Sequence, residues 1–389
     1  MGASTHVLVM PSFYPTRERP TLGRFFRDQA EAVHGSGLRV GVISAEVRSL
    51  RTLTPAALRE SHFQVEVSYE GGIPTIRLRG WNPLAQTSLG ALVWGVEMNR
   101  LARRYVKEFG RPDIVHAHNA LWAGVAARDV ARTVRCPYVV TEHSSEFLVR
   151  DLRGFRRAAA VRAFSDAARV VCVSSALAQR VNGYVDRAPA VVPNTVDADV
   201  FVPPPGARGD DPYVFLSVGN LTPNKGHDVL LQAFARQYSG SRGVRLVIGG
   251  DGPEASLLRA RAIELGIAQQ VEFLGPLSRD QVRDAMWRAN AFVLASFNET
   301  FGVVLIEALA TGLPVISTRC GGPEDIVNPE VGILVEPGDE IGLAKAMVAV
   351  REGLGLDPQR LRTYAATRYG YNVVGGILRD LYLQLLRTS

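Results

Sequence analysis

The sequence predicts an α/β fold made of two doubly wound domains, and three observations support this prediction. Short apolar runs alternate with helical patterns along the whole chain, which is typical of parallel sheets joined by right-handed crossovers. At 389 residues the chain exceeds what one hydrophobic core usually holds. Residues 191–211 are rich in Pro and Gly, separate two series of alternating elements, and are expected to form a linker.

Apolar runs in both halves predict buried strands. In the first half these are Val7–Met10, Val40–Ile43, Ile114–His118, Tyr138–Thr141 and Val170–Val173. In the second half they are Val214–Val218, Arg245–Ile248, Val271–Leu274, Ala291–Ala295 and Val315–Ser317. We therefore expect a first domain over residues 1–195 and a second over residues 196–370. The final segment, residues 371–389, contains an amphipathic helix over Tyr371–Leu386, because Leu378, Leu381 and Leu385 fall on one face.

Composition and hydropathy predict a globular protein of the cytoplasm. Hydrophobic residues make up 47% and charged residues 21% of the chain, as in ordinary globular domains. No apolar run reaches the roughly 18 residues that span a bilayer, and the N-terminus enters a strand without a signal-peptide pattern. Cys136, Cys172 and Cys320 show no metal-ligand spacing and suit a reducing compartment. We expect neither a cofactor nor a resident metal.

Positive charge is concentrated in the first half of the chain. Residues 1–195 contain 26 Lys+Arg and 16 Asp+Glu, a difference of +10, whereas the remainder has 18 and 22, a difference of −4. Part of the excess lies in a predicted helix that holds Arg150, Arg153, Arg156, Arg157, Arg162 and Arg169. Such a surface favours peripheral contact with an anionic membrane at its inner face, or with an anionic acceptor. An arginine-rich solvated surface explains it equally well, and we expect no nucleic-acid partner.

Two glutamates eight positions apart, Glu299 and Glu307, are the most informative feature of the sequence. Glu299 follows the predicted strand Ala291–Ala295, Gly302 marks a turn, and Glu307 lies about one and a half turns into the apolar helix 303–310. Ligands bind outside the carboxyl ends of strands in α/β sheets, and helix N-termini favour phosphate. A glutamate in an apolar helix is costly unless its carboxylate accepts hydrogen bonds, which a ribose diol would donate. The alternative is a glutamate that reaches water from the helix surface.

A Gly-rich loop at residues 219–226 is a candidate for holding a diphosphate. It follows the predicted strand Val214–Val218, precedes a helix and carries Lys225. Backbone amides and one ammonium group suit anionic oxygens. A second loop, at residues 11–25, follows the first strand and contains Gly23, where a helix is expected to begin. A tight turn with positive φ accounts for that glycine equally well.

Two histidines end neighbouring predicted strands. His118 closes Ile114–His118, and His143 follows Tyr138–Thr141. Because the carboxyl ends of parallel strands face the same crevice, we expect both side chains to serve the function. His116 and His118 are not expected to hold a metal, since no third ligand clusters with them.

The pattern Glu-x7-Glu followed by Gly-x-Pro-Val-Ile, within residues 298–316, resembles the retaining family 4 glycosyltransferases of the GT-B fold. The resemblance covers nearly the whole chain. It implies two Rossmann-like domains that face each other across a cleft, with the C-terminal helix crossing back to the first domain. It also implies a nucleotide-diphosphate sugar as donor, held by the second domain. The acceptor, which would be a saccharide, a lipid-linked glycan or a small natural product, would dock on the first domain near Tyr14 and His118.

The resemblance assigns expected roles to single positions. Glu307 would hold the ribose, Lys225 the diphosphate, and the backbone near Leu274 the base, with Gly23 next to the diphosphate. Glu299 and the loop at Gly321 and Gly322 would hold the sugar, with His143 beside it, and Gly302 and Val303 would begin a helix whose positive end faces the phosphates. We predict His143, Lys225 and Glu299 as catalytic. The family's phosphate-loop arginine falls near Asn220, so this chain departs from the pattern and its second cation is unassigned.

Catalysis is expected to stabilise the leaving diphosphate without a metal, with front-face attack and with the departing phosphate taking the acceptor proton. A nucleotide-sugar epimerase and a non-catalytic sugar-nucleotide sensor are the alternatives to this function.

Two motifs that resemble other binding sites are set aside as decoys. Asp197-Ala198-Asp199 lies in the expected linker and not at a strand end. Gly250–Ala255 fits a dinucleotide fingerprint but lies in the second domain, where Glu272 opens its strand instead of closing it.

Overall fold

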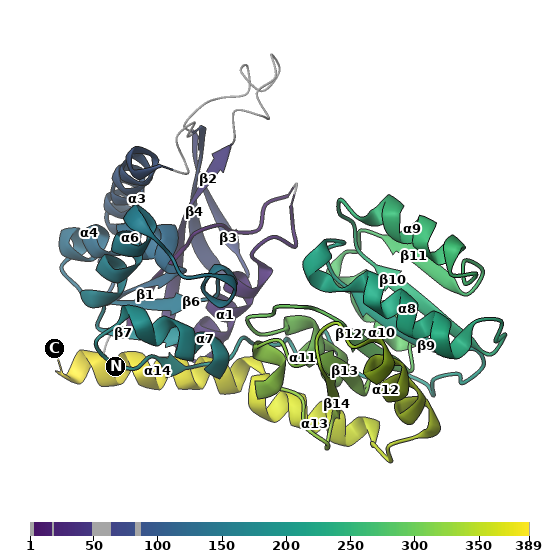
Figure 1. Cartoon of the computed structure of the whole chain (residues 1–389). Coiled ribbons are helices and arrows are strands. Elements are labelled where there is room, and N and C mark those ends of the chain that lie inside the picture. The colour runs from purple at the N-terminus through teal and green to yellow at the C-terminus, as the bar shows by residue number, and fades with distance from the viewer. Residues whose placement is uncertain (1–3, 18, 49–63, 82–86, 389) are drawn as a thin grey trace. The chain divides into compact units, whose positions relative to one another are not determined.

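The computed structural model describes residues 4–17, 19–48, 64–81 and 87–388. The chain divides into two compact units (Figure 1). Unit 1 contains Met1–Asn194 together with Tyr371–Ser389, and unit 2 contains Thr195–Gly370. Each unit is an α/β domain with a sheet of its own, which confirms the predicted fold class.

Unit 1 is built on an eight-stranded sheet with the order β3-β4-β2-β1-β5-β6-β7-β8. The strands are β1 (His6–Pro11), β2 (Arg39–Arg48), β3 (Gln64–Glu70), β4 (Ile73–Trp81), β5 (Ile114–His118), β6 (Tyr138–Glu142), β7 (Arg169–Cys172) and β8 (Ala190–Val191). All neighbours pair in parallel except β3 and β4, which form an antiparallel hairpin at one edge. The sequence did not predict this hairpin. Strand β3 alternates polar and apolar residues and is largely exposed, so it lacks the apolar run that is typical of a buried strand.

The helices of unit 1 lie in two groups. The first group consists of α3 (Ser88–Phe109), α4 (Val125–Val134) and α6 (Gly154–Ser165), in which α4 packs against both α3 and α6. The second group includes α1 (Arg24–Gly35), which packs against α14 (Tyr371–Thr388), and Figure 1 shows α14 in yellow along unit 1. The short helices α5 (Glu146–Val149) and α7 (Ser175–Val181) and the single turns η2 (Ala120–Gly124) and η3 (Asn182–Tyr184) complete the unit.

The C-terminal helix α14 returns to unit 1, as the resemblance implied. Tyr371 donates a hydrogen bond from its hydroxyl to Asp28 Oδ1 over 2.6 Å. The Tyr382 hydroxyl lies 2.6 Å from His116 Nδ1, and both side chains are buried. Leu378 is fully buried, whereas Leu381 and Leu385 pack partly buried against the same core. The helix therefore closes the core of unit 1 with apolar contacts and two specific tyrosine hydrogen bonds.

Unit 2 contains a six-stranded parallel sheet with the order β11-β10-β9-β12-β13-β14. Its strands are β9 (Tyr213–Val218), β10 (Val244–Gly249), β11 (Val271–Gly275), β12 (Ala291–Leu294), β13 (Val315–Thr318) and β14 (Gly332–Val335). Its helices are α8 (His227–Tyr238), α9 (Ala255–Glu264), α10 (Arg279–Arg288), α11 (Val303–Ala310), α12 (Glu340–Glu352) and α13 (Pro358–Tyr369), with short turns η4 (Pro223–Lys225) and η5 (Gly322–Asp325). The edge strand β14 was not anticipated from the sequence. It is only half-buried, so its apolar pattern is short.

The segment predicted as a linker is mostly part of unit 2. Val191 ends β8 of unit 1, and the division between the units falls after Asn194. Beyond it, Phe201 is fully buried. Arg362 donates to the carbonyl oxygens of Phe201 and Ala198 over 3.2 and 3.1 Å. Pro and Gly in this stretch therefore lie in an irregular segment that packs within unit 2, and they do not make it a free linker.

The prediction of one arginine-rich helix that holds Arg150 through Arg169 is also wrong. Arg150 and Arg153 have extended backbones between α5 and α6, and Arg169 begins β7. Glu146 accepts from Arg150 over 2.6 Å and also pairs with Arg156. Extended residues interrupt the helix, and part of the positive charge is paired locally. No helix among the described residues is long and apolar enough to cross a bilayer.

The contact between α14 and α1 generates a test. A Cβ atom at Gly375 would lie 2.1 Å from the Ala32 carbonyl oxygen, whereas one at Gly376 meets nothing within 4 Å. Gly375→Ala must push α14 away from α1, so we expect it to lower the free energy of unfolding by about 1–3 kcal/mol. Gly376→Ala should raise it by about 0.5–1 kcal/mol through helix propensity. Denaturant unfolding of both variants measures the difference, and equal stabilities would contradict the close packing of α14.

Candidate active site

Lys225 and Glu299 meet at the carboxyl edge of the unit 2 sheet. Lys225 ends η4 in the loop after β9, and Glu299 lies in the loop after β12. Their side chains form an ion pair, because β9 and β12 are adjacent parallel strands. Ser296 donates from its hydroxyl to Glu299 Oε1 over 2.8 Å. Lys225 is 23% and Glu299 12% exposed, so an ammonium group and a carboxylate are both available at this edge.

Further hydrogen bonds hold these loops in place. Asn224 Nδ2 donates to the Asn298 carbonyl oxygen over 2.9 Å, and Asn298 Nδ2 donates to Asn224 Oδ1 over 3.2 Å. The Glu299 amide donates to the Cys320 carbonyl oxygen over 3.0 Å. The loops after β9, β12 and β13 therefore form one bonded layer that fixes the positions of Lys225 and Glu299.

Helix α11 begins immediately after this layer. Gly302 precedes it with φ of 93° in the left-handed region, a conformation that side chains disfavour. Val303 and Glu307 are spaced i, i+4 on one face, and both are partly exposed, whereas Ile306 and Ala308 are buried. Glu307 is thus less buried than the apolar sequence around it suggested. The N–H groups that lack partners within the helix are those of its first turn, which begins at Gly302 and Val303, one turn before Glu307.

The glycine loop after β13 is held by hydrogen bonds from its own amides. The Gly322 amide donates to the Glu299 carbonyl oxygen over 2.7 Å, and the Gly321 amide donates to the Glu324 carboxylate over 3.0 Å. In the structure described, the loop uses both amides to hold its own shape. That Gly321 and Gly322 hold the sugar stays a prediction. Asn220 is exposed after β9, and Leu274 is partly exposed near the end of β11, so both lie at the same sheet edge as Lys225.

In unit 1, His118 and His143 come together as the sequence predicted. His118 ends β5 and His143 follows the adjacent strand β6, and His118 Nδ1 lies 3.0 Å from His143 Nε2. Burial lowers the pKa of His143 to about 3 and that of His118 well below its usual value. Both imidazoles are therefore neutral at pH 7, and one donates to the other. His118 Nε2 makes no hydrogen bond among the described residues.

Glu142 is a site residue whose role the sequence did not reveal. Its side chain is fully buried and accepts from the amides of Ala120 over 2.8 Å, His143 over 2.9 Å and Ser144 over 2.8 Å. Burial raises the pKa of Glu142 to about 7, against the effect of these amides. Glu142 joins the turn after β5 to the turn after β6 and so positions His143. The only hint of this role in the sequence was that Glu142 directly precedes His143.

The remaining unit 1 candidates have structural contacts. Tyr14 is 4% exposed and belongs to the core, with the Arg77 guanidinium 5.7 Å from its ring centroid. His118 is fully buried, and its ring centroid lies 5.1 Å from that of Phe26. Gly23 precedes α1 with φ of 73°. Neither Tyr14 nor His118 presents its side chain to solvent, which disfavours the direct acceptor contacts expected of them.

The two decoy motifs have other roles. Asp197 Oδ1 accepts from the amides of Asp199 and Val200 over 3.1 and 3.2 Å, so it caps a turn. Glu272 is the second residue of β11 and lies away from its carboxyl end. Within the described residues, no group of three or more His, Cys, Asp or Glu is arranged to hold a metal ion.

Comparisons with known proteins place both units in one group of enzymes. The family model described as Glycosyltransferase Family 4 matches residues 22–200, and the model described as Glycosyl transferases group 1 matches residues 203–367. The chain is 28% identical to the putative teichuronic acid biosynthesis glycosyltransferase TuaC of Bacillus subtilis, over 88% of each chain. It is 32% identical to the gpi3 subunit of phosphatidylinositol N-acetylglucosaminyltransferase from Schizosaccharomyces pombe, over 61% of this chain and 53% of the yeast protein.

Solved structures share the fold over the whole chain. Sucrose-phosphate synthase from Thermosynechococcus elongatus has a TM-score of 0.78 at 20% identity and covers 99% of this chain and 100% of its own. Anabaena HepE in complex with UDP has a TM-score of 0.73 at 20% identity and covers 98% of this chain and 100% of its own. At these identities the likeness concerns the fold.

The buried histidines generate a prediction for the pH dependence of stability. Burial lowers the pKa of His116 to about 3, so the unfolded chain takes up a proton on it below about pH 6.5 and the folded chain does not. Stability should therefore fall as the pH drops through this window. Between pH 7.5 and 5.5, His116→Gln should lose about 1.4 kcal/mol less than the unsubstituted protein. The raised pKa of Glu142 acts in the opposite direction, and it cancels in this comparison.

Denaturant unfolding at the two pH values measures the difference. Equal losses for the variant and the unsubstituted protein would show that His116 is not buried in its neutral form.

Proposed function

We propose that this chain, which belongs to the family 4 glycosyltransferases of the GT-B fold, transfers a sugar from a nucleotide-diphosphate sugar to a hydroxyl acceptor with retention of anomeric configuration. The observation that carries the proposal is the Lys225–Glu299 ion pair at the carboxyl edge of the unit 2 sheet. Helix α11 begins at Val303, shortly after Glu299, and carries Glu307. One edge of the sheet thus offers a cation, a helix N-terminus and two carboxylates to one ligand.

Each donor group has a matching protein group. Lys225 and the α11 N-terminus at Gly302 and Val303 suit the diphosphate, because both carry positive charge. Glu307 accepts hydrogen bonds from the ribose diol, and Glu299 accepts one from a sugar hydroxyl. Anabaena HepE, which shares the fold, has been solved with UDP and with UDP-glucose, and this supports a nucleotide sugar as the donor class for this chain.

Lys225 is one of only three lysines in a chain with 44 Lys+Arg residues. A lysine ammonium is a compact, strongly hydrated charge on a flexible stem, whereas an arginine fork prefers fixed bidentate partners. In the resting structure the ammonium is paired with Glu299. On donor binding, Lys225 turns to the diphosphate and leaves Glu299 to the sugar.

The bonds that break and form, and the proton that moves, all belong to the two substrates. The bond between the anomeric carbon and the phosphate oxygen breaks, and the acceptor oxygen forms the new bond on the same face. The departing phosphate oxygen takes the acceptor proton. Lys225 and the helix N-terminus stabilise the charge that develops on the diphosphate, which is the largest electrostatic change in the reaction. His143 is neutral at pH 7 because of its lowered pKa, so it offers a hydrogen bond and no charge.

The acceptor class is a hydroxyl-bearing saccharide, lipid-linked glycan or small natural product. The similar proteins carry names that refer to teichuronic acid and to phosphatidylinositol, which supports a glycan or glycolipid acceptor. We place the reaction at the cytoplasmic side of the cell. Product analysis separates transfer from the alternatives, because an epimerase converts the donor without an acceptor and a sensor binds without turnover.

Donor binding is tested by thermal unfolding with UDP-, GDP-, ADP- and TDP-sugars. A donor at 100 times its dissociation constant stabilises the folded protein by about 2.7 kcal/mol. Glu307→Gln should weaken binding of the stabilising donor about ten- to a hundredfold, since a hydrogen bond to a charged acceptor contributes roughly 1.5–3 kcal/mol. Glu336→Gln provides a control at an exposed glutamate of unit 2. If no nucleotide sugar stabilises the protein, the proposed donor class is wrong.

Removal of the Lys225 ammonium should slow transfer more than it weakens binding. The charge on the diphosphate grows as the glycosidic bond breaks, so Lys225→Ala should lower kcat at least tenfold with a smaller change in KM. Lys345→Ala, at an exposed lysine of α12, should leave both constants unchanged. A Lys225→Ala/Glu299→Gln double variant shows how much of the loss comes from leaving Glu299 unpaired. If the kcat of Lys225→Ala stays within two- to threefold of that of the unsubstituted enzyme, the diphosphate role of Lys225 is refuted.

The proposed reaction uses no metal ion, so activity should persist in EDTA.

A further inference from the structure

The outer face of α3 exposes an apolar stripe that the packing of unit 1 does not explain. The inner face of the helix is buried through Trp94, Met98, Leu101 and Tyr105. On the outer face, Leu89, Leu92, Val93 and Val96 follow the spacing i, i+3, i+4, i+7 and are 53, 63, 41 and 59% exposed. Within the described part of the chain, no other helix exposes more than two large apolar side chains. The first half of α3 is therefore apolar on both faces.

Basic residues continue the same stripe toward the end of α3. Arg100, Arg103 and Lys107 follow Val96 at helical spacing, and all three are exposed. The structure describes every residue from Leu89 to Lys107, and no acidic residue among them lies on this stripe. Glu97 and Glu108 lie on its flank, where Glu97 approaches Arg100 to 4.0 Å. The surface is thus lipophilic at one end and cationic at the other.

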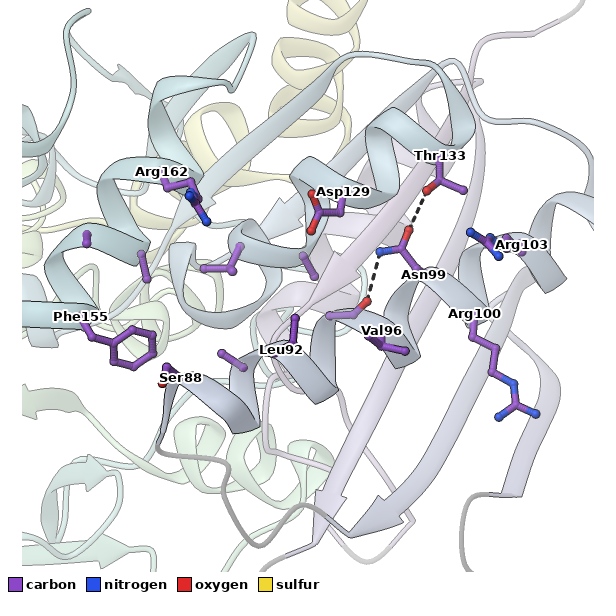
Figure 2. Close-up of a pocket in the computed structure, with 16 residues that line it drawn as sticks. Ser88, Leu92, Val96, Asn99, Arg100, Arg103, Asp129, Thr133, Phe155 and Arg162 are labelled. Carbon is purple, nitrogen blue, oxygen red and sulfur yellow. Dashed lines mark hydrogen bonds between the residues drawn. The ribbon is translucent and has the colours of Figure 1, made fainter.

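A groove with a volume of about 970 Å³ runs between α3 and the pair α4 and α6 (Figure 2). Its lining is mainly apolar, with Leu92 and Val96 on α3 and Phe155 on α6. Arg100, Arg103 and Arg162 supply positive charge, and Asp129 is the one acidic residue in the lining. Figure 2 shows Asn99 bonded to Thr133, which ties α3 to α4 over 2.9 Å.

We propose that unit 1 binds an anionic lipid bilayer through the outer face of α3 and the adjoining groove. The apolar stripe enters the boundary between headgroups and acyl chains, as in other amphipathic helices that lie on membranes. The basic end contacts lipid phosphates, which attract each arginine or lysine near the surface. A protein partner would need acidic residues at matching positions, whereas an anionic bilayer offers negative charge at any spacing.

This surface replaces the arginine cluster at residues 150–169 as the basis for membrane contact. Arg150 and Arg156 pair with Glu146, and the Arg157 guanidinium lies over the Tyr184 ring at 4.6 Å. These three cations have partners within the protein, whereas Arg162 of the same cluster lines the groove beside α3. The arginines of the α3 stripe adjoin exposed leucine and valine side chains, which is the combination that interfacial binding requires.

The groove also leads toward the candidate site within unit 1. Phe155 stacks on Trp122 with ring centroids 5.8 Å apart, and Trp122 lies in η2, directly after β5 and His118. A bilayer on α3 would therefore lie near the carboxyl edge of the unit 1 sheet. This inference goes beyond the proposed function, because binding to a bilayer requires neither donor nor transfer.

Sedimentation with lipid vesicles tests the proposal. Protein should pellet with vesicles of phosphatidylcholine containing about one third phosphatidylglycerol, and much less with phosphatidylcholine alone. Binding should fall in about 1 M salt, where the screening length is about 3 Å. Arg100→Gln/Arg103→Gln should weaken partitioning about 25-fold, at about fivefold for each basic residue. Leu92→Glu/Val96→Glu should weaken it at least tenfold, since both exposed side chains would lose their place in the bilayer boundary.

Two matched controls make the outcome decisive. Leu257→Glu/Ile263→Glu changes two apolar residues of α9 in unit 2 that are 61 and 69% exposed, and Arg150→Gln/Arg153→Gln removes two arginines of the cluster outside α3. Both should bind vesicles like the unsubstituted protein. No binding at low salt, or equal binding by the α3 variants, overturns the proposal. Loss of binding only in the Arg150/Arg153 variant assigns the contact to the other surface, and it overturns the proposal as well. Thermal unfolding confirms that each variant is folded.

Discussion

The ion pair between Lys225 and Glu299 depends on a single feature of sheet topology, and the candidate site depends on the ion pair. Strands β9 and β12 are neighbours in the sheet, although β10 and β11 lie between them in the sequence. Their following loops therefore end at the same edge and are bonded through Asn224 and Asn298. In the proposed function, this layer positions Lys225 and the start of α11 for one diphosphate. A change in strand order would separate these groups, whatever the loops contained.

The interior of unit 1 contains a cluster of buried polar side chains. His118 and His143 are neutral because burial lowers their pKa values, and Glu142 accepts hydrogen bonds from the amides of Ala120, His143 and Ser144. His116 bonds to Thr141 on β6 over 2.7 Å and to Tyr382 on α14 over 2.6 Å. The last helix of the chain therefore contributes to the same buried cluster as the strands that carry the histidines. The two clusters therefore differ in charge: the edge of the unit 2 sheet holds the Lys225–Glu299 ion pair, whereas the unit 1 cluster holds neutral imidazoles and one buried carboxyl group.

The surface of unit 1 carries the charge that its interior lacks. Positive residues exceed negative ones by ten in the first half of the chain, but the cations differ in their surroundings. Those near Glu146 are paired within the protein, whereas those on α3 continue an exposed apolar stripe. Net charge alone did not distinguish these two surfaces. Helical spacing and exposure did, because an interfacial helix needs apolar and basic residues on one face.

The sequence by itself determined the α/β class, the two domains, most buried strands and helix α11 with its bounds at Val303–Ala310. These features follow from fully apolar runs and from Gly and Pro at their ends, which are local properties of the chain. The sequence also predicted that His118 and His143 lie close together, since the carboxyl ends of neighbouring parallel strands lie at one edge of the sheet. Only the tertiary structure revealed the β3–β4 hairpin, the amides that hold Glu142, and the internal use of the Gly321 and Gly322 amides. Lys225 and Glu299 are 74 residues apart, and their pairing depends on strand order and on hydrogen bonds between loops, which local residue patterns do not encode.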